Sequence, residues 1–190
     1  MNVVLASASP RRRELMEMLD VENLIILPAR GEEVPPEHAS GPELVKTLAL
    51  AKAREVAALC APEDLVIGAD TIVWVDEHPF GKPRDREDAA RMLRRLSGDC
   101  HTVYTGVAVL HGGEEDVEYE ESRVWFRELS DEEIARYIAT GEPMDKAGAY
   151  GAQGRGALLV RAIEGDFFNV MGLPLCRLGQ MLRKQGVELL

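Results

Sequence analysis

Apolar and polar residues follow one another along this chain with two different spacings, which predicts strands and helices in alternation. Apolar runs rich in Val and Ile, and runs that alternate apolar with polar residues, predict strands over residues 3–6, 24–27, 65–67, 71–75, 101–110, 117–126 and 158–163. Apolar residues repeated every three or four positions predict helices over residues 11–19, 42–60, 86–97, 134–139 and 174–185. The pattern therefore indicates an α/β protein.

Short polar motifs mark the ends of several of these elements. Asp85 is a good helix cap, and Gly98 supplies the stop of the same helix. The sequence Ser130-Asp131-Glu132-Glu133 has the form of a capping box, and His111-Gly112-Gly113 predicts a hairpin between two strands. Gly68-Ala69-Asp70 divides an apolar, β-branched segment, so we expect it to interrupt or bend a buried strand.

The order of the elements predicts a mixed, twisted sheet flanked by helices. No internal repeat and no linker-like segment interrupts the series. The chain has 190 residues, close to the typical size of one domain. We therefore expect residues 1–190 to form a single domain arranged in two lobes.

Composition narrows the classes of protein to which the chain can belong. Hydrophobic residues make up 46% and charged residues 29% of the sequence, values typical of a folded globular protein rather than a disordered one. Acidic residues outnumber basic residues by 33 to 22, and the formal net charge of -11 disfavours nucleic acid and anionic membranes as partners. A ligand that carries phosphate therefore needs a local basic pocket.

The sequence predicts neither secretion, nor a membrane span, nor a disulfide framework. The three cysteines stand at long spacings without a Cys-x-x-Cys pair. The first residues do not have the order of segments that is typical of a secretory signal. No apolar run reaches the roughly 18 residues that a membrane-spanning helix needs. We therefore expect a protein of the cytoplasm. Whether it is a monomer or a homodimer is left open.

The first candidate site is the segment Ser7-Ala8-Ser9-Pro10-Arg11-Arg12-Arg13, between a predicted strand and a predicted helix. Ser9 suits the cap position and Pro10 the first helical position. A helix N-terminus offers unpaired N–H groups and partial positive charge, and the arginines add donors for phosphate oxygens. We interpret the segment as an anion site; a capped surface helix with a solvated basic start is the alternative.

The second candidate is a carboxylate in an apolar strand. Asp70 would be costly to bury alone, so a divalent metal or a lysine should face it. In such a place the carboxylate could also position or deprotonate a water molecule. Lys82 follows twelve residues later, within reach through a hairpin. The alternative is a turn aspartate that binds its own backbone.

Other candidates have weaker signals. Glu32 and Glu33, in the loop after the second predicted strand, could ligate a metal, although adjacent acids in loops are usually only solvated. Lys52 lies between two alanines on a predicted helix. In residues 145–154, small side chains would let the backbone approach a ligand, and Gln153 offers an acceptor and a donor to a base edge. A flexible connection is the alternative for that segment. The four histidines do not have the spacing of a zinc site.

Several ordered motifs together resemble the Maf family, the septum-formation-inhibitor-like nucleoside triphosphate pyrophosphatases. They cover nearly the whole chain and are Leu5-Ala6-Ser7-Ala8-Ser9-Pro10-Arg11-Arg12, Gly68-Ala69-Asp70-Thr71, Gly81-Lys82-Pro83, residues 93–98, residues 145–154 and Gly172-Leu173-Pro174. The resemblance implies an α/β fold related to the inosine triphosphate pyrophosphatases, with a cleft between two lobes. It also implies hydrolysis of a nucleoside triphosphate to the monophosphate and diphosphate with a divalent cation, Mg²⁺ or Mn²⁺.

The resemblance also implies roles for particular positions. Asp70 matches the catalytic base, and the other polar positions of the family's active cleft are matched by Ser7, Arg12, Glu33, Lys52 and Lys82. Glu33 and Asp70 would hold the cation, with Glu32 as the alternative to Glu33. The amides from Ser9 to Arg11 would help Arg12 and Lys82 to hold the triphosphate. The branch that acts on dTTP and UTP, rather than on 7-methyl-GTP, is indicated by Arg11, Thr71 and Gln153.

Two alternative functions remain open at this point. A regulator of cell division that binds a nucleotide without turnover is an alternative of another class, and a 7-methyl-GTP pyrophosphatase is an alternative within the family. A DNA-binding accessory protein is disfavoured by the net charge of -11. Release of diphosphate from a panel of nucleotides separates these functions.

Overall fold

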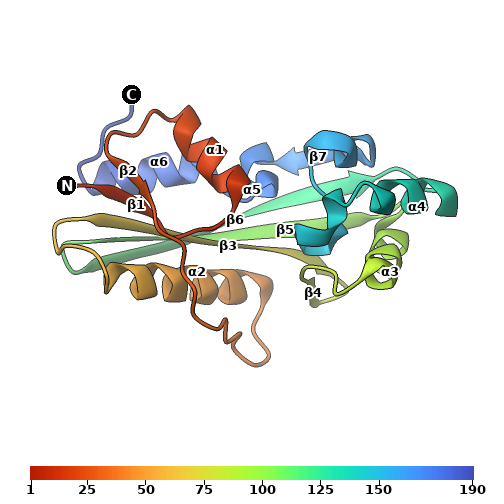
Figure 1. Ribbon diagram of the computed structural model, residues 1–190, viewed down its shortest axis with the longest axis horizontal. Coiled ribbons are helices and arrows are strands. Elements are labelled where there is room, and N and C mark those ends of the chain that lie inside the picture. Colours follow the sequence, from red (N-terminus) through yellow and green to blue (C-terminus); the bar gives the residue numbers. More distant parts are fainter.

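The computed structural model describes residues 1–190 and has one seven-stranded sheet with helices on both faces (Figure 1). The strands are β1 (Val3–Leu5), β2 (Leu24–Ile26), β3 (Leu65–Val75), β4 (His78–Phe80), β5 (Cys100–His111), β6 (Glu114–Phe126) and β7 (Val160–Gly165). The helices are α1 (Pro10–Met18), α2 (Gly41–Ala57), α3 (Arg86–Leu96), α4 (Asp131–Ala139), α5 (Phe167–Met171) and α6 (Leu175–Lys184). The expected fold class, a mixed sheet flanked by helices, is confirmed.

The sheet is mixed because the chain uses two kinds of connection. The strand order is β2-β1-β3-β5-β6-β7, and β4 pairs with the end of β3. β1 lies parallel to β2 and β3, since α1 and α2 supply the long crossovers that parallel strands need. The remaining pairs are antiparallel. The β5–β6 hairpin turns at Gly112 and Gly113, both at positive φ, as the sequence predicted.

Helices cover both faces of the sheet at the end where the chain begins. α1 and α6 pack on one face, where Leu5, Leu15 and Leu178 are fully buried. α2 packs on the opposite face, where Ala49 and Ala53 meet β1 and β3 (Figure 1). Successive residues of a strand point to opposite faces of the sheet, so the apolar run at the start of the chain contributes side chains to both of these cores.

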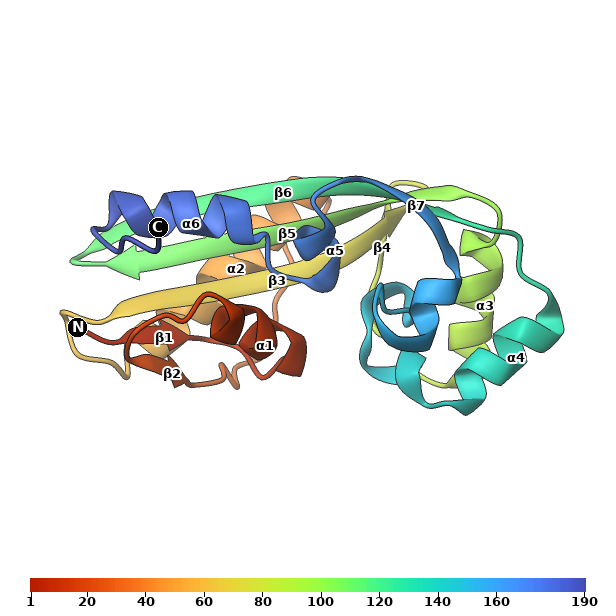
Figure 2. The ribbon, with the colours of Figure 1, turned by 90° about the horizontal axis from the view of Figure 1, so that it is seen from above.

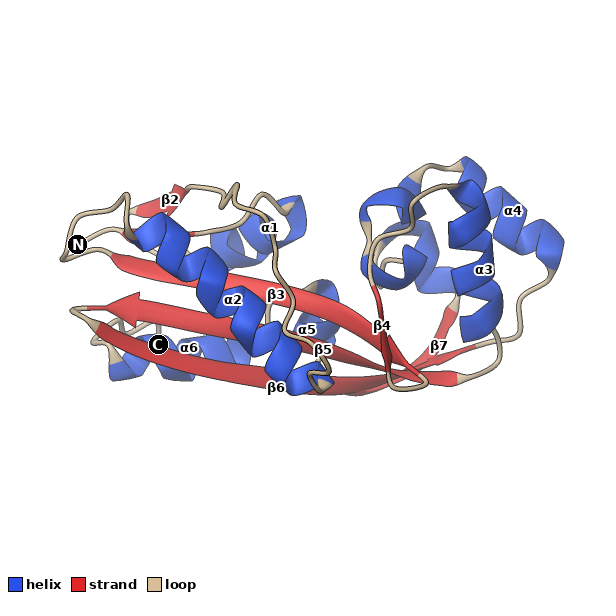
Figure 3. Ribbon diagram, turned by 90° about the horizontal axis from the view of Figure 1, so that it is seen from below, coloured by secondary structure: helices blue, strands red, loops and turns tan.

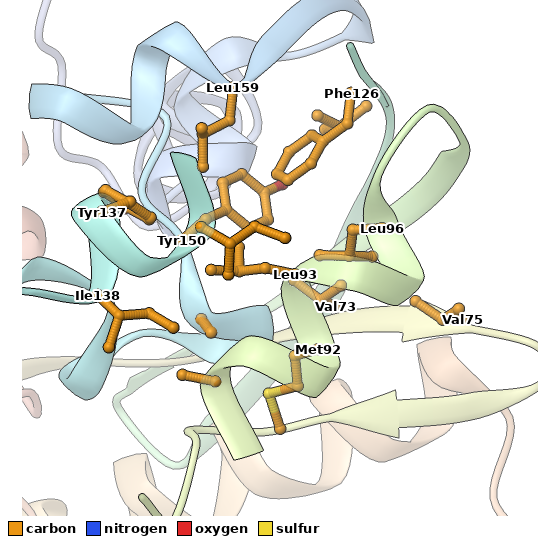
Figure 4. Close-up of a cluster of buried hydrophobic side chains, with 14 of the residues drawn as sticks. Val73, Val75, Met92, Leu93, Leu96, Phe126, Tyr137, Ile138, Tyr150 and Leu159 are labelled. Atoms are coloured by element: carbon orange, nitrogen blue, oxygen red, sulfur yellow. The ribbon is translucent and has the colours of Figure 1, made fainter. Parts of the chain in front are cut away.

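A second group of helices lies at the other end of the long strands. Figures 2 and 3 show α3 and α4 apart from the group formed by α1, α2 and α6, with β3, β5 and β6 running from one group to the other. The core of this second lobe joins Val73 of β3 and Phe126 of β6 to Leu93 of α3 and to Tyr150 (Figure 4). The chain therefore forms two lobes that share three strands.

The prediction that Gly68-Ala69-Asp70 interrupts or bends a strand was wrong as far as an interruption is concerned. β3 continues from Leu65 to Val75 without a break. A Cβ atom on Gly68 would lie 2.3 Å from the carbonyl oxygen of Ala49 on α2, and one on Gly106 of β5 would lie 2.2 Å from that of Val45. The glycines are therefore required by the close approach of α2 to the sheet.

The predicted helix caps are confirmed, and the remaining differences concern the ends of elements and short elements. Asp85 accepts a hydrogen bond from the Asp88 amide at 2.7 Å, and Ser130 accepts one from the Glu133 amide at 3.2 Å. β6 begins at Glu114, three residues earlier than expected, and α2 ends at Ala57, three residues earlier than expected. The last strand begins at Val160, two residues later than expected. The sequence did not predict α5, because a helix of five residues is too short to show a period. None of the helices combines the length and the apolar character that a membrane crossing requires.

Candidate active site

A cleft of about 600 Å³ gathers most of the polar residues that the sequence singled out. Its walls come from the start of α1, the middle of α2 and β3, the turn after β4, the segment around residue 146 and the segment after α5. The predicted residues that line it are Ser7, Ser9, Arg11, Arg12, Glu33, Lys52, Asp70, Thr71 and Lys82. Segments far apart in the sequence therefore meet at one place.

The start of α1 has the predicted cap, but it offers fewer free amides than expected. Ser9 is the N-cap and accepts from the Arg12 amide at 3.5 Å, and Pro10 occupies the first helical position. The Ser9 amide donates to the Ser7 hydroxyl at 3.2 Å. Since proline has no N–H group, the Arg11 amide is the one left in this turn for a ligand. The anion site is thus built mainly from side chains.

Arg12 joins three segments of the chain. Its Nε donates to the carbonyl oxygen of Gly172 at 2.7 Å, and its two terminal nitrogens donate to the hydroxyls of Ser7 at 3.3 Å and Thr71 at 2.9 Å. A guanidinium has five N–H donors, so two remain for a ligand. Burial lowers the pKa of Arg12 and the nearby Asp70 opposes this effect, so an anion in the cleft would relieve the desolvation of the guanidinium.

Asp70 lies in the middle of β3 with a lysine against it. The Asp70 side chain is nearly buried, and Lys52 Nζ of α2 lies 2.5 Å from its Oδ1. The same ammonium lies 2.8 Å from Oε1 of Glu33. Burial raises the pKa of Asp70, while the charges of Lys52 and Arg12 act in the opposite direction. The sequence predicted that either a divalent metal or a lysine faces Asp70, and within the chain that group is Lys52. The alternative, a turn aspartate that binds its own backbone, is wrong.

The structure distinguishes between the two adjacent acids of the loop after β2. Both side chains are exposed, but Glu33 lines the cleft and forms the ion pair with Lys52, whereas Glu32 lies outside the lining. Lys82 reaches the cleft because β3 and β4 form the hairpin that the sequence suggested. Glu33 and Lys82 therefore face the same space as Asp70.

Two carboxylates could take part in holding a divalent cation. No group of three or more His, Cys, Asp or Glu side chains converges anywhere in the chain. Mg²⁺ typically uses one or two carboxylates and completes its shell with water and substrate phosphates, so a complete protein cage is not needed. Asp70 and Glu33 both reach Lys52 Nζ, which shows that they share one cation-sized region of the cleft. The donor set fits Mg²⁺ or Mn²⁺ together with a phosphate ligand.

The glycine-rich segment contributes differently from the expectation. Gln153 is exposed and is not among the residues that line the cleft. Lys146 lines it instead, with Nζ held by the Glu142 carbonyl oxygen at 2.7 Å and by the Asp145 carboxylate at 2.6 Å. Lys146 was not among the residues predicted from the sequence, although a charged side chain among small residues is a signal that points to it.

Tyr150 connects the cleft to the core of the second lobe. Its ring packs edge-to-face on Phe126, with centroids 4.7 Å apart, and its hydroxyl lies 2.7 Å from His101 Nε2. His101 is almost fully buried, and burial lowers its pKa to about 4. The sequence assigned no role to His101, and the structure places it beneath a wall of the cleft rather than inside it.

The chain is similar to known proteins over almost its whole length. The model of a family described as Maf-like protein matches residues 2–185. A dTTP/UTP pyrophosphatase of Pelotomaculum thermopropionicum is 50% identical over 190 residues, covering 99% of this chain and 98% of that protein. A dTTP/UTP pyrophosphatase of Moorella thermoacetica is 53% identical over 188 residues, covering 98% of this chain and 96% of that protein.

Solved structures with partial similarity come from more distant proteins. A nucleoside-triphosphatase described as a dITP/XTP pyrophosphatase, from Mycobacterium abscessus, is 20% identical with a TM-score of 0.43 and covers 68% of this chain and 76% of that chain. A HAM1 protein from Coxiella burnetii is 15% identical with a TM-score of 0.47 and covers 66% of this chain and 73% of that chain.

Proposed function

Since this chain belongs to the Maf-like protein family, we propose that it is a nucleoside triphosphate pyrophosphatase that hydrolyses dTTP and UTP. The products are the nucleoside monophosphate and diphosphate. The observation that carries the proposal is the identity of about 50% to dTTP/UTP pyrophosphatases over nearly the full length of both chains. The cleft supports it, because it combines cationic side chains with a nearly buried carboxylate.

Cationic groups on both sides of the cleft would hold the triphosphate. Arg12 keeps two N–H donors free beside Ser7 and Thr71, and Arg11 adds its side chain and its amide. Lys82 lines the same space after β4. Charge-assisted hydrogen bonds from such groups to phosphate are among the stronger ones in proteins. They give the cleft a local affinity for anions despite the net charge of -11.

Glu33 and Asp70 are the groups that would hold Mg²⁺ or Mn²⁺. A bound divalent cation there would supply neutralisation of phosphate charge and polarisation of a phosphoryl oxygen. Lys52 already occupies this region with its ammonium and keeps the two carboxylates close to each other. Lys52 therefore organises the acidic side of the cleft.

Asp70 is the group best placed to act on the attacking water. Its Oδ1 is engaged by Lys52, while no group of the chain donates to Oδ2, which is left to accept a hydrogen bond from water. The water oxygen forms a bond to the α-phosphorus as the bond from that phosphorus to the oxygen bridging to the β-phosphate breaks. Diphosphate leaves with the bridging oxygen and its electron pair, and Asp70 accepts the water proton. Arg12 and Lys82 stabilise the charge on the departing group.

The proposed reaction can be tested with purified protein, Mg²⁺ and a panel of UTP, dTTP, CTP, ATP and 7-methyl-GTP. We expect UTP and dTTP to have the highest kcat/KM, with diphosphate and the nucleoside monophosphate as products. Release of orthophosphate instead of diphosphate would contradict the reaction. Binding of nucleotide without turnover would favour the regulator of cell division, and a preference for 7-methyl-GTP would move the protein to the other branch of the family.

Base recognition by Gln153 is part of the proposal, although Gln153 is exposed and lies three residues beyond Tyr150, which lines the cleft, rather than in the lining itself. Its amide can match the O4 acceptor and the N3–H donor that uracil and thymine both present. We expect Gln153→Glu to lower kcat/KM for UTP and dTTP more than for ATP, because a carboxylate has no donor for O4. Gln180→Glu, the same change on α6 at an exposed glutamine, should leave all rates unchanged. An equal loss for every nucleotide would contradict base recognition by Gln153.

A further inference from the structure

The loop between β2 and α2 brings Glu33 to the cleft, but few polar contacts anchor it. Residues 28–39 form no helix or strand, and most of them are exposed. The Glu33–Lys52 ion pair is one link between these residues and the rest of the protein. The only hydrogen bonds that join this segment to another part of the chain run from the Arg30 and Gly31 amides to the Glu55 side chain.

Glu55 receives these amides with good geometry. Its Oε1 accepts from the Arg30 amide at 2.7 Å and from the Gly31 amide at 3.0 Å, and its Oε2 also lies 3.0 Å from the Gly31 amide. An ionised acceptor makes such bonds stronger than a neutral one. A Cβ atom on Gly31 would lie 2.7 Å from Oε2, so the absence of a side chain at this position gives the carboxylate its room.

The position of Glu55 on α2 places it close to the cleft machinery without entering it. Glu55 follows Lys52 by three residues, a spacing that puts two side chains on the same side of a helix. It also lies in the last turn of α2, where a negative charge interacts unfavourably with the helix dipole. Its bonds to the loop offset that unfavourable location. Glu55 is absent from the lining of the cleft.

We propose that Glu55 is a positioning residue that holds the loop so that Glu33 faces the cleft. α2 would then hold the loop at two points. Lys52 pairs with the Glu33 side chain, and Glu55 binds the backbone amide of Gly31, two residues before Glu33. The inference rests on the proposed function, in which Glu33 helps to hold a divalent cation beside Asp70. If the loop is already ordered before the ligand binds, binding does not have to cover the conformational entropy that ordering the loop would cost.

A double-mutant cycle tests whether Glu55 acts through Glu33. In the full-length protein with Mg²⁺ and UTP, we expect Glu55→Ala to lower kcat/KM about tenfold, the size of effect seen for groups that orient metal-binding side chains. In the Glu33→Gln background the same change should lower it less than about twofold, because no carboxylate is left to position. Arg54→Ala, a change at the neighbouring residue of α2, is the matched control, since it breaks the exposed ion pair of Arg54 with Glu115 of β6.

A second measurement does not depend on activity or on a metal. In the metal-free protein, hydrogen exchange at the Arg30 and Gly31 amides should be faster in Glu55→Ala than in the wild type and unchanged in Arg54→Ala. Glu55→Gln keeps one acceptor oxygen but turns an amide nitrogen toward a backbone N–H. We expect it to give intermediate exchange and intermediate kcat/KM, and it serves as the test if Glu55→Ala does not fold.

The possible outcomes separate the inference from the proposed function. Unchanged activity in Glu55→Ala, with activity lost in Glu33→Gln, would overturn the positioning role alone. Equal losses from Glu55→Ala in both backgrounds would also overturn it, because they indicate a structural effect unrelated to Glu33. Unchanged activity in Glu33→Gln would remove Glu33 from the proposed function, and the positioning role with it.

Discussion

Asp70 and Asp88 show how two nearly buried aspartates can have opposite effects on the fold. Burial raises the pKa of Asp70, so its ionised form is held in an environment that disfavours the charge. Hydrogen bonds from Arg91 and from the Arg84 amide lower the pKa of Asp88 to about 2, so its charge favours the fold. A carboxylate whose charge is unfavourable for folding is a common feature of functional sites.

We expect Asp70→Asn to lose activity and to keep its stability. The amide preserves the shape of the side chain but cannot accept a proton from water, so kcat/KM for UTP should fall at least about 100-fold. Asp88→Asn is the control and should show the reverse, a lower Tm with unchanged kcat/KM. Circular dichroism and a diphosphate assay measure both quantities. More than a tenth of the wild-type rate in Asp70→Asn would exclude Asp70 as the base.

His101 should make the fold sensitive to acid. Its Nδ1 has no hydrogen-bond partner, and burial lowers its pKa to about 4 in the folded protein. The unfolded chain, with an ordinary pKa near 6.5, binds the proton first as the pH falls. The contribution of neutral His101 is therefore fully present above about pH 6.5 and is lost as the pH falls toward 4, by about 3 kcal/mol in total.

Denaturant unfolding of the wild type and of His101→Gln at several pH values tests this expectation. The free energy of unfolding of the wild type should fall more steeply between pH 6.5 and pH 4 than that of the variant. His111→Gln, a change at a histidine on the β5–β6 hairpin, should behave as the wild type does. Parallel curves for the wild type and His101→Gln would show that His101 is not the titrating group.

Among the elements, α2 places the ammonium of Lys52 in the cleft. It lies against β3 and β5 at Gly68 and Gly106, where no side chain separates helix and strand. This close contact brings Lys52 to hydrogen-bond distance of Asp70. The placement of the ammonium therefore depends on two glycines that do not themselves line the cleft.

We expect Gly68→Ala to impair both stability and activity. The new Cβ would lie 2.3 Å from the backbone oxygen of Ala49, so α2 must move away, at a typical overpacking cost of about 1–3 kcal/mol. Gly179→Ala on α6 is the control, because its Cβ meets nothing within 4 Å and alanine favours a helix interior by up to about 1 kcal/mol. Thermal unfolding and UTP turnover measure both variants. A stable, active Gly68→Ala protein would contradict the close-packing argument.

At the scale of the whole molecule, the long strands join the two lobes. β3 contributes Leu65 and Ile67 to the core beneath α1 and α6, and Val73 and Val75 to the core beside α3 and α4. β5 and β6 cross between the lobes in the same way (Figure 2). We propose that residues 1–190 fold as a single domain, because neither lobe can keep its core without strands that also belong to the other.

Calorimetry tests this proposal. We expect one transition whose calorimetric and van't Hoff enthalpies agree, and a single shift of that transition when a non-hydrolysable UTP analogue is added. At about 100 times its Kd, a ligand stabilises the fold by about 2.7 kcal/mol, which corresponds to several degrees for a chain of this size. Two separate transitions, with only one of them shifted by the analogue, would contradict the single domain.

The sequence by itself determined the type and order of the long elements, their caps and the basic start of α1. These features depend on interactions between residues close together along the chain, such as Ser9 with Arg12 or Ser130 with Glu133, and such interactions leave a local pattern. The short elements β4 and α5 were harder to predict, because three or five residues are too few to show a period.

Only the tertiary structure decided how the polar residues meet. The pairing of Lys52 with Asp70, the choice of Glu33 over Glu32 and the contact of Arg12 with Gly172, 160 residues away, all depend on helices packed against a sheet. The continuity of β3 through Gly68 has the same origin, since the glycine accommodates a helix from elsewhere in the chain. Contacts between distant segments leave no periodic signal in the sequence, because each partner satisfies its own local pattern equally well without the other.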